Sequence, residues 1–119
     1  MENKEFGQEL EKRTRIFAIS IIRLSSSLPK TSEGLVIRNQ ITKSGTSIGA
    51  NYREANRARS KSDFANKMSI SEAEASETIY WLEIIEDLNW VPAEKLLNIS
   101  KESKEILAIF TSIGKKLRP

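Results

Sequence analysis

The sequence contains neither histidine nor cysteine. Without histidine it lacks the commonest general base, the usual zinc ligand and the Glu-x-x-His pairs of di-iron helical bundles. Without cysteine it has no thiolate nucleophile, no thiolate metal site and no disulfide. These absences remove the commonest catalytic and metal-binding classes. We therefore expect no enzymatic activity, no catalytic residues, no metal site and no cofactor.

Long hydrophobic runs are also missing. No stretch approaches the roughly 20 apolar residues that a membrane-spanning helix needs. The first twenty residues are rich in charge, so they do not resemble a secretory signal. An intracellular setting is the simplest one for a chain without cysteine. The sequence thus predicts a cytoplasmic protein with no membrane partner.

Motifs for nucleotide or acid–base chemistry are incomplete. Gly45 and Gly49 are not followed by the lysine and the serine or threonine that a phosphate-binding P-loop requires. Glu74 and Glu77 lie three residues apart, a spacing more typical of a solvated helix face than of a buried carboxylate pair. The remaining carboxylates therefore do not change the expectation of a non-enzymatic protein.

The composition is that of a chain that folds. The 119 residues fall in the size range of one domain and are too few for two well-buried cores. Hydrophobic residues make up 39% and charged residues 29%, which is not the balance of a disordered chain. We expect residues 1–119 to form a single domain.

Turn-forming residues divide the apolar pattern into four helical segments. The first covers about residues 6–28 and stops before Pro29, whose ring disfavours helical geometry in the preceding residue. Thr31 or Ser32 can cap the second helix by accepting a backbone N–H bond. Polar residues at 60–63 precede the third segment, and a further break separates it from the fourth.

The third segment has the strictest helical repeat. Short turns between four helices make sequential neighbours antiparallel, and no convincing strand remains. The sequence therefore predicts an all-α fold, an antiparallel up-down-up-down four-helix bundle. The repeat in the third segment has four-three spacing and consists of Phe64, Met68, Ser71, Ala75, Thr78, Leu82 and Ile85.

The second segment carries a run of small residues in its middle. Gly45 and Gly49 together cost on the order of 2 kcal/mol relative to alanine in a helix interior. Either a neighbouring helix packs closely there, or the helix kinks or approaches a ligand. Its apolar positions are Leu35, Ile37, Ile41, Ile48, Tyr52, Ala55 and Ala58.

Charge is divided unevenly along the chain. Residues 31–67 are mostly basic, whereas residues 68–100 contain seven acidic residues against Lys95 alone. The pattern fits a phosphate-binding face, attraction between subunits, or simply two solvated helix faces. Arg53 lies beside Glu54 and can also pair with an acid on an adjacent helix or subunit. The candidate nucleic-acid-binding residues are Arg53, Arg57, Arg59, Lys61 and Lys67.

Several segments together resemble the 23S rRNA intervening-sequence proteins. The resemblance is strongest from about Phe17 to Leu88 and implies a four-helix bundle that associates into rings, typically pentamers. It also implies a relationship to the accessory protein of diversity-generating retroelements, a basic barrel that binds a reverse transcriptase and nucleic acid. It supplies no catalytic residues. The segments that carry it are Leu28-Pro29-Lys30, Thr46 to Ala55, Asp63-Phe64, Lys67 and Ala73 to Leu82.

The third helix carries more apolar surface than one partner helix would cover. A ring needs two different patches that meet between neighbouring copies. We expect Tyr80, Trp81 and Ile84 to form an oligomer interface. We also expect at least one of Tyr52, Tyr80 and Trp81 to be an ordinary core aromatic. Two functions remain open: an oligomeric module that binds RNA or DNA through backbone electrostatics, and a protein-interaction scaffold without nucleic-acid affinity.

Overall fold

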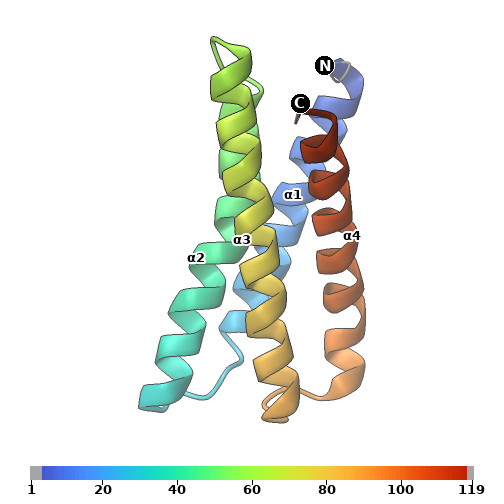
Figure 1. Ribbon diagram of the computed structural model, residues 1–119. Helices are drawn as coiled ribbons and strands as arrows, with labels where there is room; N and C mark the ends of the chain where they lie inside the picture. The colour runs from blue at the N-terminus through green and yellow to red at the C-terminus, as the bar shows by residue number, and fades with distance from the viewer. Residues whose placement is uncertain (1–3, 118–119) are drawn as a thin grey trace.

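The computed structural model describes residues 4–117 and consists of four helices joined by short turns (Figure 1). Successive helices run in opposite directions, and the described residues contain no strand. The predicted all-α, up-down-up-down four-helix bundle is confirmed. The helices are α1 (Lys4–Ser25), α2 (Ser32–Ala55), α3 (Lys61–Asp87) and α4 (Ala93–Leu117).

The four helices contact one another in chain order. α1 packs on α2, α2 on α3 and α3 on α4, and α4 then returns to α1 with a much thinner contact. Across the described residues, the backbones of the diagonal pairs α1–α3 and α2–α4 do not approach each other closely. α1 and α3 therefore present their outward faces on opposite sides of the bundle.

The core follows the repeats expected from the sequence. All seven residues of the α3 repeat, from Phe64 to Ile85, are buried. Tyr52 of α2 and Phe110 of α4 meet edge to face, with ring centroids 5.4 Å apart. Leu35 departs from the expected pattern, because its side chain is 45% exposed. The buried side of α2 includes Gly34 and Ile41, and Leu35 lies on a different side of the helix.

Close packing explains the small residues of α2. A Cβ atom built on Gly45 would lie 2.8 Å from Cγ2 of Ile21, and one on Gly49 would lie 2.8 Å from Oγ1 of Thr14. Both Ile21 and Thr14 belong to α1 and are fully buried. α2 is continuous from Ser32 to Ala55, so the expectation of tight helix packing is confirmed.

Capping side chains set several helix ends. Thr31 accepts a hydrogen bond from the Gly34 N–H at 3.0 Å, which confirms one of the two predicted caps of α2. Asn89, just after α3, adopts a left-handed φ of 56°, a conformation that asparagine tolerates at helix ends. α1 ends at Ser25, three residues earlier than expected, because the chain continues as turns through Ser26 and Ser27 to Leu28.

No helix in the described part of the chain is both long and apolar enough to cross a membrane.

Candidate nucleic-acid interface

An open groove of about 730 Å³ lies at the end of the bundle where α1 begins and where α2 turns into α3. This end is at the top of Figure 1, where α4 also ends. Apolar and small residues, among them Ala55, Ala58 and Phe64, form part of its lining. We call it the basic groove, after the four basic residues that line it: Lys4, Arg57, Arg59 and Lys61.

Local structure holds the α2–α3 turn beside α1. Ser60 caps α3 by accepting a hydrogen bond from the Asp63 N–H at 3.0 Å. The cap fixes the backbone at Ser60, and Arg59 and Lys61 are the residues directly before and after it. Asn56, just after α2, donates from Nδ2 to Oε2 of Glu11 in α1 at 2.8 Å. The turn is therefore tied to α1, and the basic residues of both segments face one groove.

The electrostatic balance of the basic groove is positive. Among the described residues that line it, Glu11 is the one carboxylate, against four bases. Glu11 accepts the hydrogen bond from Asn56, and its Oε1 lies 3.7 Å from Nε of Arg53. The N-terminus of α3 adds partial positive charge, which Asp63 in the first turn offsets. The groove therefore favours an anionic ligand.

The structure separates the five candidate binding residues into two groups. Arg57, Arg59 and Lys61 are exposed and line the basic groove. Arg53 lies one turn earlier on α2, and its loose contact with Glu11 matches the alternative that it pairs with an adjacent helix. Lys67 lies outside the groove.

Lys67 is engaged within the bundle. Its Nζ lies 2.9 Å from Oε1 of Glu54, which joins α3 to α2. The hydrogen bond to Glu54 raises the pKa of Lys67 above its ordinary value. The charge of Lys67 is thus already matched by a carboxylate, and it is a weaker candidate for phosphate than the residues in the groove.

Lys4 was not among the candidate residues. It lies in the first turn of α1, more than fifty positions from Arg57, yet both line the same groove. An antiparallel bundle brings the start of the first helix to the same end as the second turn. Lys4 could therefore be predicted only from the topology, that is, from which helices are neighbours and in which directions they run.

The predicted oligomer interface lies toward the other end of α3. Tyr80 is 55% exposed, and its ring meets that of Trp81 edge to face at 5.0 Å. Trp81 packs partly against the core and donates its indole N–H to Oε2 of Glu77 at 3.0 Å. Ile84 is half-buried. Trp81 thus belongs in part to the subunit core, whereas Tyr80 is open to solvent.

Residues 4–117 show no group of three or more carboxylates arranged to hold a metal ion.

Comparison with known proteins identifies the family. The family model for the 23S rRNA-intervening sequence protein matches residues 8–112. The chain belongs to this family. The match to the 23S rRNA-intervening sequence protein model includes Arg57, Arg59 and Lys61 but begins after Lys4.

A crystal structure of a similar protein has the same fold. It is a protein of unknown function from the S23 ribosomal protein family of Bacteroides thetaiotaomicron, with a TM-score of 0.82 and 40% sequence identity. The alignment covers 89% of this chain and 98% of that one. No curated protein sequence matches the chain.

Proposed function

We propose that this member of the 23S rRNA-intervening sequence protein family is a non-enzymatic, homo-oligomeric module of the cytoplasm that binds RNA or DNA through its phosphate backbone. The observation that carries the proposal is the basic groove, where Lys4, Arg57, Arg59 and Lys61 meet one carboxylate within residues 4–117. Guanidinium and ammonium groups are the side chains that engage phosphate best.

The groove favours the backbone over the bases. Phe64 is the one aromatic residue in the described part of its lining, and only 8% of its surface is exposed. Stacking of bases needs an accessible aromatic face, so single-strand recognition by stacking has no support here. Contacts from exposed basic side chains to phosphate position a nucleic acid without reading its sequence. The ligand expected is a structured polyanion, and sequence preference should be slight.

Self-association makes a small groove effective. A few phosphate contacts per subunit give weak binding, whereas several grooves on one assembly act together on one long polyanion. Tyr80, Trp81 and Ile84 are the proposed contact on α3, and they lie away from the basic groove. Assembly through them would leave the groove accessible.

A salt titration with matched variants tests the proposal. The probe is a fragment of 23S ribosomal RNA, chosen for the family, with a DNA duplex of equal length beside it. The test variant is Arg57→Gln/Arg59→Gln/Lys61→Gln, and Lys4→Gln is measured separately. The control, Lys95→Gln/Lys101→Gln/Lys104→Gln, removes the same number of exposed charges from α4.

We expect the wild-type protein to bind at low salt and to release steeply as salt rises. Each basic side chain that binds a phosphate should contribute about 0.7 to 0.9 to the log–log slope. The slope should therefore fall by up to three such increments in the groove variant, by one in Lys4→Gln, and by none in the control. Equal binding by the groove and control variants would overturn the groove assignment. Failure of the wild-type protein to bind either nucleic acid would favour the scaffold function.

A further inference from the structure

The outward face of α1 carries an apolar stripe that residues 4–117 leave about half exposed. Ile16, Ile19 and Ile22 are 53%, 43% and 47% exposed. They are spaced three residues apart, so they follow one side of the helix. Phe17 and Ile21 point to the core instead. Exposed isoleucines grouped in this way indicate a contact surface.

From Lys12 onward, the charges that α1 places beside the stripe are all positive. Two carboxylates, Glu9 and Glu102, lie near Ile16 at the start of the stripe, and Glu102 is bound by Arg13. From Lys12 to the end of α1 at Ser25 there is no acidic residue. Lys12, Arg15 and Arg23 are spaced to lie beside the isoleucines. Within residues 4–117 none of these three forms an ion pair, whereas nearby Arg13 is held by two glutamates of α4.

The C-terminal part of α3 has the opposite charge. Tyr80 and Leu88 are 55% and 50% exposed, and Ile84 lies between them on the same side. Glu83 and Asp87 share this side by their spacing. From Met68 to the end of α3 there is no basic residue.

The position of these acids is unfavourable in an isolated subunit. Glu83, Glu86 and Asp87 lie near the C-terminus of α3, where the helix dipole already places partial negative charge. The last turn has no basic residue, and none of the three acids forms an ion pair within residues 4–117. A positively charged partner would relieve both effects.

We propose that the isoleucine face of α1 in one copy packs against the C-terminal face of α3 in a second copy. Isoleucines then meet Tyr80, Ile84 and Leu88, and Arg15 and Arg23 meet Glu83 and Asp87. α1 and α3 lie diagonally across the bundle, so the two faces cannot cover each other within one subunit. The contact is therefore heterologous. This assignment rests on the homo-oligomer of the proposed function and names the surface that completes its interface.

Charge reversal on each face tests the pairing. Arg15→Glu/Arg23→Glu alters α1 and Glu83→Lys/Asp87→Lys alters α3, and a third protein carries both pairs. Lys101→Glu/Lys104→Glu on the exposed side of α4 is the matched control, and Ile19→Ser tests the apolar part. Sedimentation velocity at micromolar concentration gives the assembly state, and circular dichroism confirms that each variant is folded.

We expect each single-face reversal, and Ile19→Ser, to dissociate the wild-type oligomer. The combined protein should reassemble, because it restores opposite charges at every interface, and the control should assemble like wild type. An oligomer that survives the α1 variants, or a combined protein that stays dissociated, would overturn the pairing. A wild-type monomer would overturn it together with the proposed oligomer.

The two proposals can fail separately. The α1 variants leave all four bases of the basic groove in place, and the groove variants leave both faces in place. If the oligomer persists in the α1 variants while RNA binding depends on Arg57, Arg59 and Lys61, the pairing is wrong and the nucleic-acid function stands. If the charge reversals act as expected but the protein does not bind RNA, the pairing stands and the nucleic-acid function is wrong.

Discussion

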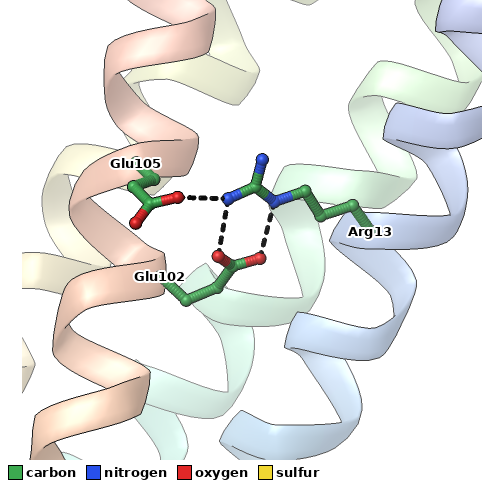
Figure 2. Close-up of polar contacts among 3 residues, drawn as sticks. All are labelled: Arg13, Glu102 and Glu105. Atoms are coloured by element: carbon green, nitrogen blue, oxygen red, sulfur yellow. Dashed lines mark hydrogen bonds and ion pairs between the residues drawn. The ribbon is translucent and has the colours of Figure 1, made fainter.

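Arg13 of α1 binds Glu102 of α4 with two parallel hydrogen bonds, Nε to Oε2 and Nη2 to Oε1, both at 2.7 Å (Figure 2). Nη2 also lies 2.7 Å from Oε1 of Glu105. The hydrogen bond to Glu102 is the main cause that raises the pKa of Arg13 above its ordinary value. This cluster spans the α1–α4 seam, where helix contact is thinnest. A polar clamp thus holds the first helix to the last.

We expect the Arg13–Glu102 pair to contribute about 1 kcal/mol to the free energy of unfolding, near the upper end for pairs this exposed. The side chains are 36% and 33% exposed, so solvent screens them considerably. A double-mutant cycle with Arg13→Gln and Glu102→Gln, measured by urea unfolding, gives the coupling. It should fall as salt rises.

Lys101→Gln is the control for that cycle. Its side chain is exposed on α4 and forms no ion pair within residues 4–117, so the change should be within about 0.5 kcal/mol. A coupling between Arg13 and Glu102 indistinguishable from zero would mean that this pair does not help to hold α1 to α4.

Gly45→Ala should destabilise the bundle although alanine is the better helix former. The added Cβ would meet Ile21 at both γ carbons, 2.8 and 2.9 Å away, and at its Cβ, 3.1 Å away. Rotation of the Ile21 side chain cannot remove the contact with its Cβ, because rotation about the Cα–Cβ bond does not move that atom. We expect a net loss of about 1 to 2 kcal/mol, since overpacking exceeds the gain in helix propensity. Thermal unfolding measures it.

Ser47→Ala is the comparison for Gly45→Ala. Ser47 lies two positions along α2, is only half-buried and already has a Cβ. Its replacement should change stability by no more than about 0.5 kcal/mol. If Gly45→Ala were as stable as wild type, α1 and α2 could separate slightly at no cost, and close approach would not be the reason for glycine.

Ser103→Ala should stabilise the protein. Ser103 is 1% exposed, and its Oγ is the one buried side-chain polar atom without a hydrogen-bond partner in residues 4–117. Removing an unsatisfied hydroxyl and adding helix propensity should together raise the free energy of unfolding by about 1 kcal/mol.

Ser112→Ala separates the two effects at Ser103. Ser112 is exposed on the same helix, so its replacement gains helix propensity alone, about 0.5 kcal/mol. Urea unfolding of both variants gives the difference. A destabilised Ser103→Ala would show that the hydroxyl has a partner in solution, such as a bound water.

The sequence predicted the fold well because the helix repeat is a local property. The spacing from Phe64 to Ile85 identified every buried position of α3. Close packing at Gly45 could also be anticipated, because glycine in a helix needs a compensating contact. Leu35 was misjudged because it lies beside the buried side of α2, which begins at Gly34 and continues to Ile41.

The candidate site was predicted only in part. Arg57, Arg59 and Lys61 are neighbours in sequence, so they were found together. Lys4 joins them across the bundle, and Lys67 is matched by Glu54. Both facts depend on the register between helices, which is set by side-chain packing and cannot be obtained from the spacing within one helix.

An even number of helices returns the chain to the end where it started. The first residues of α1 and the last of α4 therefore lie at the same end as the basic groove (Figure 1). A fluorophore attached to the first turn of α1 or to the last turn of α4 will therefore lie at the end of the bundle that holds the groove. Such a label should make a sensitive proximity reporter for a bound ligand, whereas a bulky group at the same place would obstruct access to the groove.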